Sequence, residues 1–222
     1  MSDVVIIAEN QRFPAHKFLL SVRSNYFKAM FGTGMRESTQ QDITLIDTPA
    51  KPFSLLLRYV YTGQMVLHAD DYQQTIEVLA LANKYEFPVL QEQIVAHLHA
   101  ILSLENVCAI YFAAELFSSE PLLDSCIYFL EMSKLDIVTS KAFLNFSLDV
   151  VKVIVEKLVW SENIEALIYG LKRWIIANDE QIEHIRPIIK PMQLELIQID
   201  QKLHIVKSFG VIEKQDQKAA SK

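Results

Sequence analysis

Cysteine is scarce in this chain, and its placement supports neither a disulfide scaffold nor a zinc site. The 222 residues include only Cys108 and Cys126, and neither belongs to a CxxC pair, the spacing found in most structural zinc sites. We interpret both as buried small hydrophobic residues, which is the common environment of a free cysteine.

Long apolar runs are also missing. The densest run, residues 107–114, is much shorter than the roughly 18 residues that a membrane-spanning helix needs. The N-terminal stretch MSDVVIIAEN is acidic where a secretory signal peptide is basic. We therefore predict no membrane insertion and expect a cytoplasmic location, with the nucleus as the alternative.

Basic residues are outnumbered by acidic ones. The chain has 21 Lys and Arg against 27 Asp and Glu, a formal net charge of −6. A nucleic-acid-binding domain carries the opposite excess, because its surface must neutralise phosphates. We expect no nucleic-acid partner.

Signatures of catalysis and of cofactor binding are missing as well. The chain contains no GxGxxG, GxxxxGK[ST], HExxH or GxSxG motif. Of the six histidines only His97 and His99 are neighbours, and residues two apart on a helix point to different faces. Asp70 and Asp71 are explained by a helix start, where the dipole favours negative charge. We predict a protein that is not an enzyme, with no metal and no cofactor.

Hydrophobic periodicity, by contrast, is strong, and it changes along the chain. Short β-branched or alternating stretches predict strands at 4–7, at 12–13 up to Pro14, at 42–45 and at 65–67. Helical spacing dominates beyond residue 102 and is clearest over 162–177. Strands followed by helices indicate an α+β module leading into an all-helical one.

Local signals also predict where helices begin and end. Ser24 is expected to cap one helix, and Thr48 with Pro49 to start another. Gly63 is expected to end that second helix, because glycine is common just past a helix terminus. Asp70 or Asp71 is expected to cap the next one.

The stretch FGTGMRES, residues 31–38, departs from its surroundings. It places Met35 between a glycine and charged residues in a predicted loop. Either Met35 packs back on the core, since methionine often fills irregular gaps, or it is held outside and enters an apolar pocket of a partner. In the second case Glu37 caps backbone amides or meets a donor.

Several stretches, taken in order, resemble the BTB/POZ family. They are Ser2–Val4, Arg12–Lys17 (RFPAHK), Leu20–Ser24, Tyr26–Phe31, Met35–Ser38 (MRES), Tyr59–Gly63 (YVYTG), Leu79–Tyr85 and Phe87–Leu90. The resemblance implies the BTB/POZ fold, a small sheet with helices, over residues 1–102.

The helical half resembles the BACK domain that follows BTB in many adaptor proteins. The supporting residues are Asn106–Cys108, Phe143–Leu144, Trp160–Glu162, Leu171–Trp174 and Lys190–Met192. This implies an all-α BACK domain over 103–210, and we expect the polar residues 211–222 to be a disordered tail. No Pro/Gly-rich linker separates the two modules, so we expect them to pack with little relative freedom.

The resemblance also implies a function. Many BTB–BACK proteins are substrate adaptors of cullin-3 ubiquitin ligases, and their cullin-contacting turn reads hydrophobic residue, any residue, glutamate. Met35, Arg36 and Glu37 match this pattern just after the 26–31 helix. The implied partners are cullin-3 and an unidentified ubiquitination substrate. The alternative is a homotypic BTB scaffold for transcriptional or synaptic complexes, independent of a ligase.

Two further expectations follow from the family. Asp3 and Lys17 match a buried charged pair near the dimer groove of some members, and the other possibility is two surface charges. BTB dimers usually exchange a helix ahead of the Asp-Val strand, where this chain has two residues, so we expect a weak homodimer with Phe18 and Val22 uncovered, or a shorter form of a longer adaptor. The usual substrate-binding module is not expected within these residues.

Overall fold

A computed structural model describes residues 2–32, 34–158, 164–178, 180, 184 and 187. The chain divides into two compact units. One consists of Met1–Leu102 with Phe112–Leu122, and the other of Ser103–Tyr111 with Leu123–Lys222.

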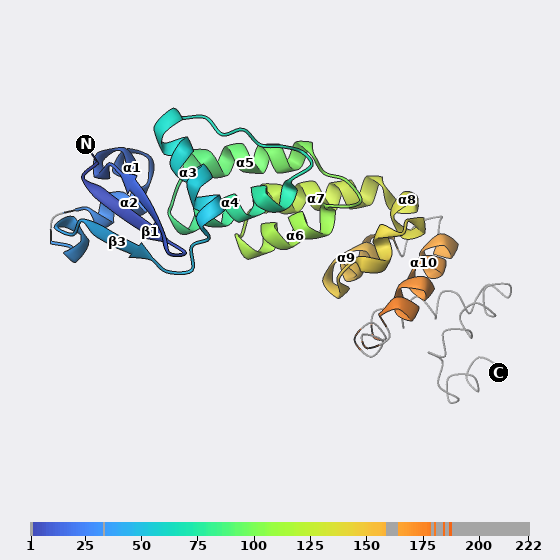
Figure 1. The fold of residues 1–222 in the computed structure, drawn as a ribbon. Coiled ribbons are helices and arrows are strands. Elements are labelled where there is room, and N and C mark those ends of the chain that lie inside the picture. The colour runs from blue at the N-terminus through green and yellow to red at the C-terminus, as the bar shows by residue number, and fades with distance from the viewer. Residues whose placement is uncertain are drawn as a thin grey trace, which may run out of the picture. The chain divides into compact units, whose positions relative to one another are not determined.

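A three-stranded sheet opens the first unit (Figure 1). Its strands are β1 (Val4–Ala8), β2 (Gln11–Ala15) and β3 (Asp42–Leu45), in the order β2-β1-β3. β1 pairs antiparallel with β2 and parallel with β3. The strands predicted at 4–7 and 42–45 are confirmed, because alternate residues of β1 and β3 are buried.

Two predictions about strands are wrong. Pro14 does not end the second strand, which continues to Ala15 and pairs Pro14 with Val5. β2 lies at the edge of the sheet, where a residue without an N–H is tolerated. Residues 65–67 form no strand but an irregular segment, since an apolar run this short carries no period.

Helices dominate the remainder of the chain up to residue 102. They are α1 (Lys17–Arg23), α2 (Asn25–Met30), α3 (Ala50–Thr62), α4 (Tyr72–Lys84) and α5 (Pro88–Ala100), with a short 3-10 turn, η1 (Arg36–Ser38), before β3.

The helix ends follow most of the local signals. Ser24 caps α2 by accepting a hydrogen bond from the Phe27 N–H, and Asp71 caps α4. Gly63 ends α3 at a φ of 71°, which glycine adopts without strain. The expected Thr48 cap is wrong, because Pro49 holds the N-cap position and a distant carboxylate, that of Glu9, accepts from the first helical N–H at 2.9 Å.

An aromatic cluster forms the core of the first unit. Phe27 of α2 stacks on Tyr85 with ring centroids 5.4 Å apart and meets the edge of Phe87 at 6.3 Å. Phe53 of α3 also contacts Tyr85. All four side chains are almost fully buried, so α2 is fixed to the core immediately before the FGTGMRES stretch.

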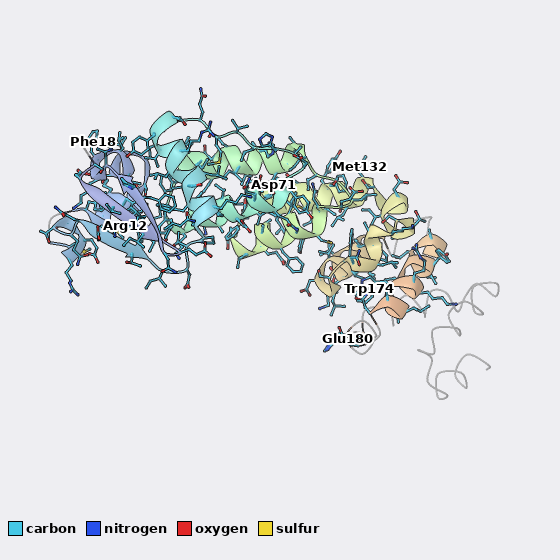
Figure 2. The ribbon with its side chains drawn as sticks, viewed as in Figure 1. Arg12, Phe18, Asp71, Met132, Trp174 and Glu180 are labelled. Carbon is cyan, nitrogen blue, oxygen red and sulfur yellow. The ribbon has the colours of Figure 1, made fainter. Side chains whose placement is uncertain are left out.

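The described part of the chain beyond residue 102 is helical, as predicted. It contains α6 (Val107–Leu116), α7 (Glu120–Met132), α8 (Lys134–Thr139), the 3-10 turn η2 (Ala142–Asn145), α9 (Leu148–Leu158) and α10 (Ile164–Ala177). Trp174 of α10, which is labelled in Figure 2, is fully buried. Its indole N–H donates to the Phe146 carbonyl at 2.8 Å. The helix predicted over 162–177 is confirmed from residue 164, and its first two residues lie outside the described range.

The helices that the structure describes are all too short or too polar to cross a bilayer. The proposed tail, 211–222, lies outside the described residues, as does the last part of the proposed BACK domain.

Candidate partner-binding site

The FGTGMRES stretch forms a closed turn after α2. Gly34 has a φ of 95° with open space around its Cα, so the backbone conformation, and not crowding, requires glycine there. Two bonds close the turn on the Met35 carbonyl, from the Ser38 N–H at 3.2 Å and the Ser38 hydroxyl at 2.6 Å. The Thr39 hydroxyl donates to the Arg36 carbonyl at 3.1 Å.

The side chains of the turn face away from the core. Met35 is 52% exposed, Arg36 is exposed and Glu37 is partly exposed. Within the part of the chain that the structure describes, the Glu37 carboxylate makes no hydrogen bond or ion pair. Met35 is therefore not buried inside its own unit. The side chains of Arg36 and Glu37 also remain available to another molecule.

Lys17, the first residue of α1, reaches across to this turn. Its ammonium donates to the carbonyls of Ser38 at 2.8 Å, Gln40 at 3.0 Å and, more weakly, Glu37 at 3.4 Å. The same ammonium lies 5.5 Å from the centroid of the Phe31 ring, within the range of a cation–π contact. Sequence reasoning missed this role, because no local pattern connects a lysine to carbonyls that lie 20 to 23 residues away.

The structure brings Asp3 and Lys17 together, but the Asp3 carboxylate contacts the backbone N–H of Lys17 and not its ammonium. Asp3 Oδ1 accepts from the Lys17 backbone N–H at 2.9 Å, and the side chain of the α1 N-cap residue, His16, accepts nothing there. Asp3 thus caps α1 from the position just before β1. Asp3 is exposed and Lys17 partly buried, and a role of the pair in a dimer groove stays a prediction.

α1 also presents an apolar surface. Phe18, which is labelled in Figure 2, is 74% exposed and Val22 is 65% exposed. Residues four apart share one helix face. Beside the start of α1, His16 Nδ1 shares a hydrogen bond of 2.7 Å with the hydroxyl of Tyr61. Burial raises the pKa of Tyr61, so this hydroxyl keeps its proton at neutral pH.

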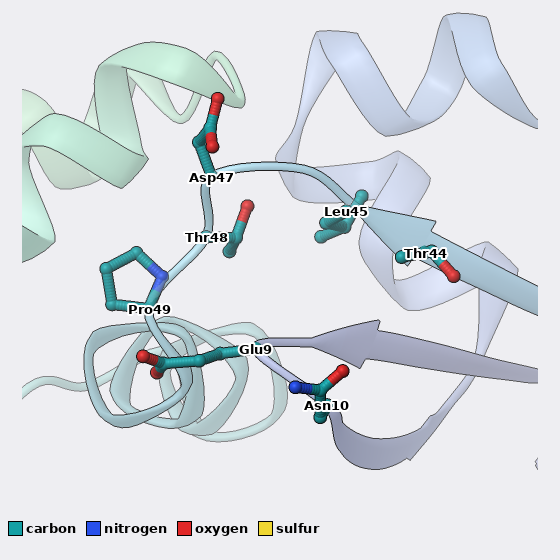
Figure 3. A pocket seen from close by; sticks show the side chains of 7 residues that line it. All are labelled: Glu9, Asn10, Thr44, Leu45, Asp47, Thr48 and Pro49. Carbon is teal, nitrogen blue, oxygen red and sulfur yellow. The ribbon is translucent and has the colours of Figure 1, made fainter.

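A hollow of about 450 Å³ lies where the β1–β2 turn meets the segment after β3 (Figure 3). Its two carboxylates, from Glu9 and Asp47, point in different directions in Figure 3. Glu9 is occupied at the start of α3, and Lys84 donates to the carbonyls of Ile46 and Asp47. These groups do not converge on a point where a substrate could react, so the hollow is explained by local structure.

Other chemistry-bearing residues do not assemble a site either. Among the described residues no three His, Cys, Asp or Glu side chains gather as metal ligands would. Cys126 is buried, as predicted, and Cys108 is mostly so. Burial raises the pKa of each thiol to about 12, which keeps both protonated and unreactive.

Comparison with known proteins identifies the first unit. The family model described as "BTB/POZ domain" matches residues 1–102. The chain is 32% identical over 211 residues to human BTB/POZ domain-containing protein 9, covering 95% of this chain and 34% of that protein. The Drosophila melanogaster protein of the same name is 31% identical over 212 residues, covering 96% of this chain and 29% of that protein.

A relative of another name matches more weakly. Human Kelch repeat and BTB domain-containing protein 12 is 29% identical over 201 residues, which is 89% of this chain and 32% of that protein. The chain therefore spans about a third of the length of the curated relatives it matches. The resemblance of the helical half to a BACK domain stays a prediction. The sheet with its covering helices, the matching model and these relatives agree: residues 1–102 of this chain form a BTB/POZ domain, a protein-interaction module.

Proposed function

We propose that this chain is a non-catalytic adaptor that binds cullin-3 of a ubiquitin ligase through Met35, Arg36 and Glu37. The observation that carries the proposal is the 52% exposure of Met35 on a turn closed by hydrogen bonds. An apolar side chain that a structured turn holds outside the core is suited to fill a pocket on another protein.

The stiffness of the turn favours binding. Ordering a loop at an interface opposes association, and a turn that is already closed avoids most of that cost. Bonds from Ser38 and Thr39 close this turn, and Lys17 ties it to α1. Glu37 supplies a carboxylate with no bond in the described chain, which fits a donor on the partner.

The adaptor would act by proximity. Holding a target beside a ligase raises the target's effective concentration at the ligase without any chemical step in this chain. The two carboxylates that line the hollow beside β3, those of Glu9 and Asp47, point in different directions, which supports an adaptor over an enzyme. The substrate to be ubiquitinated is not identified by any feature of these residues.

Calorimetric titration with the N-terminal region of cullin-3 tests the proposal. Met35→Ala should weaken binding by about tenfold or more, since truncating a hot-spot side chain costs more than about 1.4 kcal/mol, and Glu37→Gln should also weaken it. Met132→Ala is the matched control, because Met132 of α7 is likewise exposed, at 69%. Equal affinity of the wild type, Met35→Ala and Met132→Ala would contradict the proposal.

A homotypic scaffold is the second candidate, favoured by the exposed pair Phe18 and Val22 on α1. Large apolar side chains this exposed on one helix face often mark a protein interface, and a second copy would bury them by twofold symmetry. Light scattering over a concentration series would detect the dimer. Phe18→Glu with Val22→Glu should abolish it and Met35→Ala should not; a monomer at all concentrations would exclude this candidate.

A further inference from the structure

We infer that Lys17 is a positioning residue for the partner-binding turn: its ammonium holds residues 35–40 in one shape from the first turn of α1. The effect on affinity rests on the proposed function, whereas the effect on the shape of the turn does not.

The number of N–H donors on the Lys17 ammonium matches the number of carbonyls that the turn presents to it, and its positive charge suits their partial negative charge. A lysine ammonium has three N–H donors and no acceptor, and three carbonyls, those of Glu37, Ser38 and Gln40, lie 3.4, 2.8 and 3.0 Å from Lys17 Nζ. Hydrogen bonds from a charged donor are roughly twice as strong as neutral ones. The Phe31 ring 5.5 Å away contributes a further contact to the cation.

The turn has few other means of keeping its shape. Its own bonds, made by Ser38 and Thr39, are local, and η1 contains no buried residue. Within the described chain, every hydrogen bond that joins residues 35–40 to a distant segment comes from the Lys17 ammonium. A segment with few buried contacts opens easily unless such bonds hold it.

Lys17 is itself firmly placed, so it can transmit position to the turn. Its backbone N–H donates to Asp3 at the entry to β1. One turn further along α1, Leu20 is fully buried and its N–H donates to the His16 carbonyl. The Lys17 side chain therefore fixes the position of the turn relative to the sheet and to the core.

The same fold contains a matched control. Lys84 makes the same type of contact on another loop, where its ammonium donates to the carbonyls of Ile46 at 2.6 Å and Asp47 at 3.0 Å. It also lies 5.5 Å from the centroid of an aromatic ring, that of Tyr85. Lys84→Met therefore removes a comparable set of interactions without affecting residues 35–40.

The experiment compares Lys17→Met, Lys84→Met and the wild type by hydrogen exchange without any partner, and by titration with the N-terminal region of cullin-3. Lys17→Met should speed exchange of the Ser38 and Thr39 amides at least about tenfold and weaken binding by about tenfold, the effect of losing one charge-assisted contact. Lys84→Met should do neither.

The two arms separate the two claims. Unchanged exchange at Ser38 and Thr39 in Lys17→Met would overturn the positioning role whether or not cullin-3 binds. Faster exchange with wild-type affinity would uphold the role of Lys17 in the shape of the turn and overturn the claim that this shape governs binding. A wild-type chain that does not bind cullin-3 would instead contradict the proposed function, and the exchange arm alone would then decide the role of Lys17 in the turn.

Discussion

Replacing Ser24 with alanine should destabilise the first unit far more than replacing an exposed serine such as Ser54. Ser24 is only 2% exposed. Its hydroxyl oxygen accepts from the Phe27 N–H at 3.0 Å and donates its proton to the Tyr85 carbonyl at 2.6 Å. One atom therefore caps α2 and joins that helix to the end of α4.

The expected loss follows from these two bonds. An N-cap serine replaced by alanine costs about 1 kcal/mol, and a buried carbonyl left without its donor costs about 1–3 kcal/mol. The contributions are not strictly additive, so we expect about 2–3 kcal/mol in the free energy of unfolding. With a urea slope of about 1–3 kcal/mol per molar, the midpoint of unfolding should fall by about 0.7–3 M.

Urea unfolding monitored by circular dichroism measures the loss in the free energy of unfolding. Ser54→Ala is the control, since Ser54 is exposed and its hydroxyl only donates to the nearby Lys51 carbonyl; it should change stability by about 0.5 kcal/mol at most. If Ser24→Ala cost no more than Ser54→Ala, the assignment of α2 as a helix fixed by this cap would be refuted.

Three other predictions concern the second unit. Gly170→Ala should lower its melting temperature, because the new Cβ would lie 2.6 Å from the Val138 carbonyl oxygen and overpacking costs about 1–3 kcal/mol; an unchanged melting temperature would contradict the close packing of α8 and α10. Burial raises the pKa of the Cys108 and Cys126 thiols to about 12 from an unfolded value near 9.0. Their contribution to stability is therefore complete below pH 9.0 and is lost as pH rises toward 12. Both thiols should also resist a thiol reagent at neutral pH until the chain is unfolded, and rapid labelling of the native protein would contradict this.

The features that local chemistry decides were predictable from the sequence. The cap at Ser24 and the terminator Gly63 each depend on a few neighbouring residues. For Met35 the neighbouring residues left two settings open, packed on the core or exposed, and the structure shows a side chain that is 52% exposed. Periodicity likewise located the strands at 4–7 and 42–45 and the helical half.

The features that depend on distant segments were not predictable in the same way. Whether Pro14 ends a strand depends on where that strand lies in the sheet, and α3 receives its cap from Glu9, 41 residues earlier. The contact of Lys17 with the carbonyls of Ser38 and Gln40 belongs to the same class. A single sequence carries no periodic signal for contacts of this range.

The central claim is that the Met35 thioether enters a pocket on cullin-3, and methyl NMR of the full chain tests it most directly. With all six methionines labelled at their methyl carbons, the N-terminal region of cullin-3 is added to saturation and the methyl signals are assigned by substitution. The Met35 signal should shift or broaden while that of exposed Met132 stays in place. A complex that forms with the Met35 signal unmoved would contradict the claim.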